Sequence, residues 1–268
     1  MAAPEYIACT RMYNVCERVA RSWDAVLETV SRLSGIRLRI ERHAYPLDIQ
    51  ALWDRPDLGL VFVCGRAFAL GGMRHKTIAV PLRERGADEE PAPLYGTHIL
   101  VRKASSFMSC EDILDARIGW TVAHSHSGYL AVKRLLAPFA GKAVEDLFTA
   151  ATGPLHTPMN CLNALRDNKA DAVPLDSYCY SLLQRNAPET VAGARILAST
   201  VEYPMPFMAA SEGVDGAVCE ALRQALFETA ELPAMADALR TLCITGFTAP
   251  ETASYAALAD PGESVFGA

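Results

Sequence analysis

A short polar stretch, HSHSGYL at 124–130, carries the residues of this chain that are best suited to chemistry. It follows the apolar run RIGWTVA and precedes the helical pattern AVKRLLAPFA, so a helix is expected to begin near Ser127. The first turn of a helix has unpaired backbone N–H groups and the positive end of the helix dipole. Ser125 and Ser127 add hydroxyl donors, and Gly128 lets a ligand approach the backbone closely. The pattern therefore predicts either an oxyanion site of the phosphate type or a plain serine N-cap.

The two histidines of this stretch do not form a metal-chelating pair. His124 and His126 are two residues apart, so on an extended segment they point in different directions. No Asp, Glu or Cys stands beside them in a recurrent ligand pattern. We therefore expect no metal site and no cofactor, and we interpret His124 as a surface histidine.

The segments that position this stretch alternate between strands and helices, which predicts two α/β units. Apolar residues spaced three and four apart predict a helix over 15–33, and Gly35 is expected to end it. The continuous apolar run at 58–64 suits a strand buried on both faces. The remaining expected strands are 5–9, 36–41, 98–103, 116–123, 146–150 and 171–175, and the remaining expected helices are 46–54, 109–115, 157–169 and 177–185.

A boundary between the two units is expected in RERGADEEPAPLYG at 83–96, where charges, prolines and glycines mark a loop or crossover. Two further helical patterns follow residue 205 and are expected to return to the first unit. The sequence thus predicts a first lobe made of 1–96 and 205–268 and a second lobe made of 97–204.

Composition limits the function classes. The net charge of −6 and the lack of a basic block argue against nucleic-acid binding. The longest apolar runs are shorter than the roughly 18 to 20 residues that span a bilayer, so no membrane insertion is expected. Eight cysteines lie far apart without a CxxC pair, and most are expected to be buried thiols in a reducing compartment. MAAPEYIACTR lacks the features of a secretory signal.

Several motifs resemble those of the phosphate/phosphonate-binding proteins of ABC transporters. That family typically shows S-T-S-G-Y at a helix start, then G-S-H-x-x-A/S before the next helix, then G-x-A-D-x-A-x-x-D. The matching segments here are SHSGYL and TGPLHTPMNCLNALRDNKADAVPLDSY. PDLGLVFVCGRAFAL and APLYGTHILVRKASSFMSCEDILDARIGW are similar to further passages of the family. The resemblance runs from about residue 5 to 210, and its specific part lies between 95 and 178.

The resemblance implies a type II periplasmic-binding-protein fold, an α/β fold of two lobes joined by two crossover segments, with the ligand held in a cleft between the lobes. It also implies a set of ligand-binding residues. By position these are Ser125, His126 and Ser127 for the serine-threonine-serine motif, His156 for the histidine of the second motif, Asp176 for the final aspartate, and Tyr95 for a cleft tyrosine, with Tyr13 and either Arg66 or Phe68 as candidates from the first lobe.

His156 and Asp176 each have a structural alternative, and the sequence departs from the family at three places. His156 can donate to an oxyanion in either charge state, or it can cap the next helix or support the site without touching the ligand. Asp176 can meet a protonated phosphonate oxygen or a cationic ligand group, or it can be the N-cap of the helix that follows. His126 stands where the family has threonine, and leucine precedes His156 where the family has serine. The family's aromatic residue after its D-L-A-W-x-G loop is shifted or replaced in GRAF at 65–68, so the ligand's identity stays open.

The expected function is a non-enzymatic solute-binding protein for a small oxyanion or phosphonate-like ligand, with an ABC-transporter permease as partner. The resemblance implies a periplasmic location, whereas the absent signal and abundant thiols favour a cytoplasmic ligand-sensing domain. An enzyme on the same fold is a further alternative, with His126, His156 and Cys161 as candidate groups, although Cys161 occupies an apolar helix position. No catalytic residue is expected on the leading interpretation.

Overall fold

The computed structural model describes residues 4–86, 89–140, 148 and 152–259. The chain folds into two compact units. Unit 1 contains the residues up to Leu94 and those from Pro204 onward, and unit 2 is Tyr95–Tyr203. The chain passes between the units at two points, where the short strands β5 (Leu94–Tyr95) and β9 (Tyr203–Pro204) pair with each other. We call β5 and β9 the crossover strands.

Unit 1 is built on a six-stranded sheet with the order β11-β4-β10-β3-β1-β2. β1 is parallel to β2 and β3, and β10 is antiparallel to both β3 and β4. Every residue of β3 is buried, as the apolar run predicted for a strand covered on both faces. The strands are β1 (Glu5–Cys9), β2 (Arg37–Ile40), β3 (Leu58–Val63), β4 (Lys76–Arg83), β10 (Phe207–Ala210) and β11 (Ile244–Thr248).

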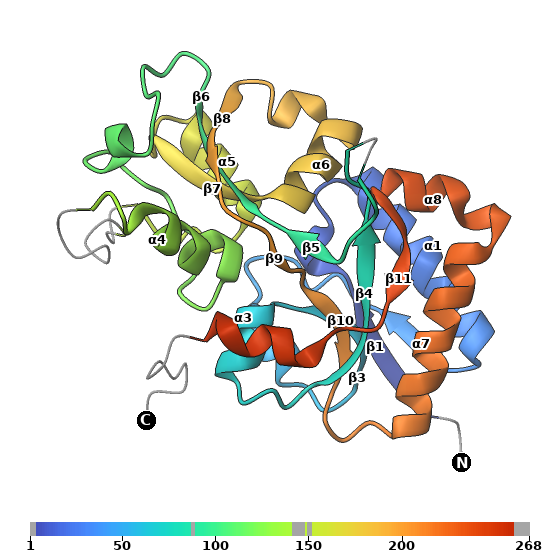
Figure 1. Cartoon of the computed structure of the whole chain (residues 1–268). Helices are drawn as coiled ribbons and strands as arrows, with labels where there is room; N and C mark the ends of the chain where they lie inside the picture. The colour runs from blue at the N-terminus through green and yellow to red at the C-terminus, as the bar shows by residue number, and fades with distance from the viewer. Residues whose placement is uncertain (1–3, 87–88, 141–147, 149–151, 260–268) are drawn as a thin grey trace. The chain divides into compact units, whose positions relative to one another are not determined.

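The helices of unit 1 pack on this sheet in two groups (Figure 1). α1 (Glu17–Ser34) packs against α7 (Gly216–Glu231) and α8 (Ala236–Thr241), and α3 (Gly65–Leu70) packs against the 3₁₀ helix η7 (Thr252–Leu258). The apolar face of α1 meets the sheet through Trp23, which is fully buried with its ring 5.2 Å from Phe62. Gly35 ends α1 in the left-handed conformation that the sequence predicted. The short helix α2 (Ile49–Trp53) precedes β3.

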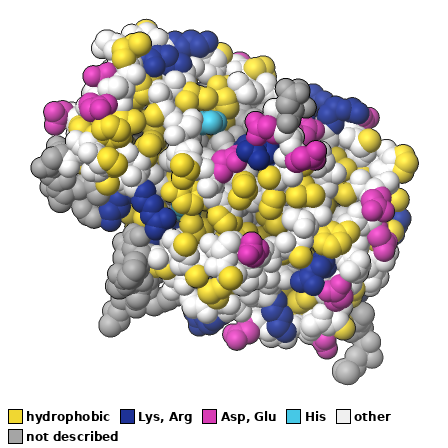
Figure 2. Space-filling model, in the orientation of Figure 1, with side chains coloured by type: hydrophobic (Ala, Val, Ile, Leu, Met, Phe, Trp, Pro, Cys, Tyr) yellow, Lys and Arg dark blue, Asp and Glu magenta, His cyan; other side chains and the backbone are white. Residues whose placement is uncertain are grey.

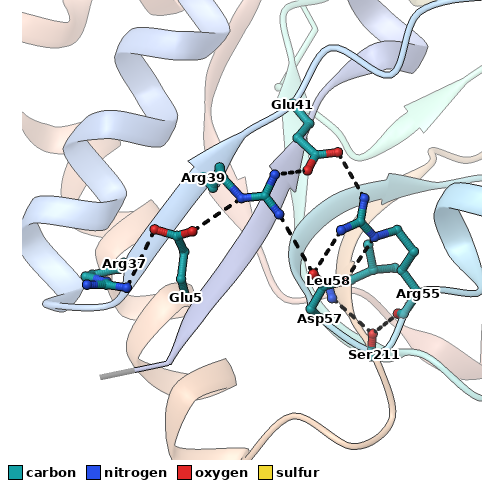
Figure 3. Close-up of polar contacts among 8 residues, drawn as sticks. All are labelled: Glu5, Arg37, Arg39, Glu41, Arg55, Asp57, Leu58 and Ser211. Carbon is teal, nitrogen blue, oxygen red and sulfur yellow. Dashed lines mark hydrogen bonds and ion pairs between the residues drawn. The ribbon is translucent and has the colours of Figure 1, made fainter. Parts of the chain in front are cut away.

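An ion-pair network covers the edge strand β2 of this sheet (Figure 3). Its members are Glu5, Arg37, Arg39, Glu41, Arg55 and Asp57, three cations and three anions. Arg39 lies at the centre, with Nε 3.3 Å from Glu5 and an ion pair to Glu41. Charged side chains on an edge strand discourage pairing with another chain, so the network protects this edge.

Charges of both signs are interspersed on the face of the molecule in Figure 2, with hydrophobic side chains between them. This face shows no continuous basic stripe of the kind that follows a nucleic-acid backbone. Within the described ranges, no helix has both the length and the apolar character needed to cross a membrane.

Unit 2 contains a three-stranded antiparallel sheet with β6 (Thr97–Arg102) between β7 (Ala172–Asp176) and β8 (Ala194–Ser199). Its helices are α4 (Ala131–Leu136), α5 (Pro158–Arg166) and α6 (Ser177–Asn186). The apolar face of β6 packs with α4 and with the 3₁₀ turn η2 (Glu111–Ile113). The core of this unit includes Ile99, Val101, Ile113, Ile118, Val132, Leu136 and Ala172.

The regular strand predicted over 116–123 is wrong. Only Ile118 forms a bridge, to Ala172 of β7. The backbone then turns to other partners, because Trp120 and Thr121 accept hydrogen bonds from the loop before α5. The helix predicted over 109–115 is reduced to the single turn η2. The strand expected over 146–150 lies, apart from residue 148, outside the described residues. The sequence does not predict β4, β11 or the crossover strands.

Candidate functional site

Thr121 joins the two segments of unit 2 in which site residues were predicted. Its N–H donates to the carbonyl oxygen of Gly128 (3.2 Å), and its own carbonyl accepts from the N–H of His156 (3.1 Å). The neighbouring Trp120 carbonyl accepts from Leu155 N–H at 2.8 Å. These bonds bring the start of the helix at 126 beside the loop that leads into α5.

Ser125 and Ser127 lie at the start of a helix that opens with a π-turn, η3 (His126–Leu130), and continues as α4. Ser125 is the N-cap, and its Oγ accepts from Gly128 N–H at 3.0 Å. The hydroxyl of Ser127 makes no hydrogen bond to any other residue in the part of the chain that the structure describes, and its side chain is partly exposed. A serine N-cap, one of the two alternatives that the pattern predicts, is thus formed by Ser125, while the hydroxyl of Ser127 is available for a ligand.

His126 lies between the two serines, but its side chain is buried, at 1% exposure. Its ring meets the ring of Tyr203 edge to face, with centroids 4.4 Å apart, and lies 5.9 Å from the ring of Tyr95. Tyr95 is also 1% exposed. Two predicted site residues, Tyr95 and His126, are therefore neighbours, and their ligand-binding roles stay predictions.

His156 stands directly before α5, as the sequence indicated. Its side chain is exposed, and its φ of +66° places it in the left-handed region, where non-glycine residues are uncommon. Thr157 is the N-cap of α5, with Oγ1 accepting from Asn160 N–H at 3.1 Å. Because the cap is supplied by Thr157, the capping alternative for the His156 side chain is not what the structure contains.

Asp176 is the N-cap of α6, which was its structural alternative. Its Oδ1 accepts from the N–H groups of Tyr178 (2.7 Å) and Cys179 (3.0 Å), and the residue is 6% exposed. It pairs with Thr97 in the ladder between β6 and β7, and β7 packs against η3. Asp176 therefore lies close to the other predicted residues of unit 2, and a ligand contact by it remains a prediction.

Trp120, Tyr129 and Phe148 form an aromatic cluster beside the helix start. The ring of Tyr129 lies 5.5 Å from Trp120 and 4.8 Å from Phe148, measured between centroids. The Cβ of an alanine at Gly153 would be 2.5 Å from Trp120 Nε1, so the loop before α5 passes close to this indole. The cluster holds the Trp120–Thr121 segment between η3 and that loop.

Asp171 anchors the turn between α5 and β7 through two arginines. Its carboxylate accepts from Arg117 Nε (2.9 Å) and from Arg102 (3.0 Å), and Arg117 N–H donates to it as well. Hydrogen bonding from Arg117, supported by Arg102, holds the pKa of Asp171 well below its usual range. Arg102 also donates to the carbonyls of Leu165 and Ala170. These bonds hold its guanidinium in place beside the Asp171 carboxylate.

This lowered pKa predicts acid sensitivity. A carboxyl group whose pKa is depressed in the folded state stabilises the fold at pH values above its unfolded pKa of about 3.9, and that stabilisation is lost as pH falls through the folded pKa. Asp171→Asn should lower the melting temperature by about 2–6 °C at pH 7. The difference from wild type should shrink steadily below about pH 4. Thermal melts of wild type and variant between about pH 3 and 7 measure this difference in melting temperature. Asp237→Asn, which removes an exposed ion-pair partner of Arg240, is the control.

Two predicted residues belong to unit 1, and both have partners inside it. Tyr13 is 1% exposed and meets Phe62 edge to face at 4.9 Å. Arg66 is buried, and its guanidinium donates to the Leu258 carbonyl at 3.0 Å. Phe68, the alternative to Arg66, packs on Phe207. Their ligand-binding roles stay predictions.

Thr121 and Tyr203 escaped the sequence reasoning. Thr121 lies four residues before Ser125 inside the run RIGWTVA, which predicts a strand, and no pattern in the sequence singles out Tyr203. Cys161, the nucleophile of the enzyme alternative, is fully buried, and burial raises the pKa of its thiol to about 12. Among the described residues, no three His, Cys, Asp or Glu side chains are grouped as a metal site.

Comparison with solved structures shows the fold. The chain is similar to PhnD1 from Prochlorococcus marinus in complex with methylphosphonate, with a TM-score of 0.73, 14% identity and 94% of each chain covered. It is similar to a binding protein component of an ABC phosphonate transporter from Pseudomonas aeruginosa, with a TM-score of 0.72, 16% identity, and 93% of this chain and 82% of that one covered. XAC2383 from Xanthomonas citri bound to ATP gives a TM-score of 0.63 at 20% identity, covering 96% and 94%. The expected type II periplasmic-binding-protein fold is confirmed.

The family of this chain follows from its match to a protein-family model. The chain matches none of the curated proteins with which it was compared. The model for the periplasmic substrate-binding protein of phosphonate ABC transporters matches residues 14–255. This range includes all of unit 2, most of unit 1 and all of the predicted site residues except Tyr13. The chain therefore belongs to the family of periplasmic substrate-binding proteins of phosphonate ABC transporters.

Proposed function

We propose that this protein binds a small oxyanion of the phosphate or phosphonate class at the Ser125–Ser127 end of the η3–α4 helix and delivers it to an ABC-transporter permease. The observation that carries the proposal is the hydroxyl of Ser127, which makes no hydrogen bond to the rest of the described chain at the start of this helix. A helix start with a hydroxyl available is suited to an anion, because N–H groups, dipole and hydroxyl all favour negative charge.

The loop before α5 supplies the second half of the proposed site. Thr121 holds the exposed His156 beside the helix start through backbone hydrogen bonds on both sides. An imidazole can donate a hydrogen bond to an oxyanion in either charge state. Ser125, Ser127 and His156 would then bind the oxygens of one tetrahedral group, and Asp176 would accept from a protonated oxygen or an amine of the ligand.

A ligand panel tests the proposal. Inorganic phosphate, phosphite and methylphosphonate are compared with ATP, arginine and glutamine, which structural neighbours bind. A ligand at a hundredfold its Kd stabilises the native state by about 2.7 kcal/mol, so an oxyanion should raise the melting temperature by about 5–11 °C. Differential scanning calorimetry measures the shift. If the three oxyanions produce none and an amino acid does, the oxyanion proposal is wrong.

A cytoplasmic ligand-sensing domain is the second candidate function. It is favoured by the eight cysteines, all of which are free thiols and seven of which are buried. Disulfides are common where proteins fold in an oxidising compartment, so unpaired thiols are unusual there. Native purification distinguishes the two functions, because recovery of a permease supports transport and recovery of a DNA-binding or kinase partner supports sensing.

A further inference from the structure

His126 is buried although both neighbouring serines are partly exposed. Its backbone belongs to the π-turn, where the Ser125 carbonyl accepts from Leu130 N–H (3.3 Å) and the His126 carbonyl accepts from Ala131 N–H. π-turns are rare and occur often at functional sites. A shift of the Ser125–Ser127 backbone therefore has to move the buried imidazole as well.

The imidazole contacts one tyrosine from each crossover strand. Tyr95 lies at the end of β5 and Tyr203 at the start of β9, and these two residues are the first and last of unit 2. The ring of His126 meets Tyr203 edge to face at 4.4 Å and lies 5.9 Å from Tyr95. Hinges are a few residues at the ends of elements that absorb backbone rotation, so these two strands are where movement between the units would be taken up.

The residues that follow β5 are bonded within unit 2. Gly96 N–H donates to Ser177 Oγ at 3.0 Å, and Thr97 N–H donates to Thr200 Oγ1 at 3.0 Å. The ring contact between Tyr203 and His126 joins β9 to the helix start. Threonine, which the resembling family has at the position of His126, is too short to provide an aromatic contact to both tyrosines.

We propose that His126 is a positioning residue that couples oxyanion binding at Ser125–Ser127 to the order of the crossover strands β5 and β9. The inference rests on the proposed function, because it needs a ligand at the helix start. A ligand that fixes the first turn also fixes the imidazole, and the imidazole then restricts Tyr95 and Tyr203. The crossover strands consequently lose freedom when the ligand binds, although neither tyrosine needs to touch it.

Hydrogen exchange of the full chain with methylphosphonate, and in a second series with inorganic phosphate, tests the coupling. In wild type the ligand should slow exchange in peptides covering 123–131 and in those covering 93–97 and 201–206. In His126→Ala, protection of 123–131 should remain and protection of both crossover regions should be lost. Affinity should fall about two- to tenfold, which corresponds to the usual contribution of an aromatic pair. His126→Phe keeps an aromatic ring and should retain the crossover protection.

Two further variants make the result decisive. Tyr203→Leu removes the same ring contact by changing the tyrosine instead of the histidine. Ligand protection of β9 should be lost and protection of 123–131 should remain. This variant tests the coupling even if His126→Ala folds poorly. His124→Ala removes an imidazole two residues away and should behave as wild type. Full crossover protection in folded His126→Ala or Tyr203→Leu overturns the coupling. If neither probe protects 123–131 in wild type, the oxyanion site itself is wrong and the coupling fails with it.

Discussion

Replacing Ser125 and Ser127 together by alanine is expected to weaken the binding of methylphosphonate or phosphate by tenfold or considerably more. Each hydroxyl can donate one hydrogen bond to a charged oxygen, and such a bond contributes about 1.5–3 kcal/mol. A loss of 1.4 kcal/mol is already tenfold in Kd. Isothermal titration calorimetry on wild type and the double variant with the same ligand measures the change.

The single variants should separate binding from capping, because the two serines differ in the fold. Ser125 Oγ accepts from Gly128 N–H, so Ser125→Ala should cost about 1 kcal/mol of stability in addition to affinity. Ser127 has no such bond within the described residues, so Ser127→Ala should reduce affinity and leave the melting temperature nearly unchanged. Ser181→Ala, which removes a hydroxyl bonded to the Ser177 carbonyl in α6, is the control for binding. Unchanged affinity in the double variant, with a lowered melting temperature, would leave only the capping role.

Local patterns in the sequence were enough to predict the elements that are defined locally. The helical spacing from 15 to 33 and the stop at Gly35 predicted α1 correctly, because both signals lie within the helix and its cap. The continuous apolar run at 58–64 predicted β3 as a strand buried on both faces. The serines before the helix indicated an N-cap as one of two alternatives, and Ser125 forms it.

Elements that depend on distant partners could not be predicted in this way. The run RIGWTVA has the composition of a strand, but after Ile118 its backbone bonds go to Gly128 and to the 155–156 loop. Thr121 gains its importance only from those contacts. The resemblance predicts His126 as a ligand-binding residue but does not predict its burial, which depends on Tyr95 and Tyr203, 31 and 77 residues away in sequence.

The contact between Gly128 and Thr121 predicts that Gly128→Ala is strongly destabilising. The added Cβ would overlap Thr121 Oγ1 and would lie 2.8 Å from Thr121 Cβ and Cγ2, which is closer than real Cβ contacts. Gly128 is not among the described glycines with positive φ, so the expected cost is steric rather than conformational. Overpacking of this kind costs typically 1–3 kcal/mol, and here we expect about 2 kcal/mol. Urea denaturation monitored by circular dichroism measures the loss.

A double-mutant cycle with Thr121→Ala identifies the cause of that loss. Removing Oγ1 and Cγ2 of Thr121 relieves part of the overlap, so Gly128→Ala should cost about 1 kcal/mol less in the Thr121→Ala background. Gly216→Ala is the matched control, because nothing lies within 4 Å of a Cβ at this first residue of α7, and it should be neutral or slightly stabilising. If Gly128→Ala lowers the free energy of unfolding equally in the two backgrounds, the overlap with the Thr121 side chain is not the cause of the loss. Ligand affinity should fall in the single variant as well, because Gly128 joins the Ser125 hydroxyl to the Thr121 backbone and a displaced residue weakens both bonds.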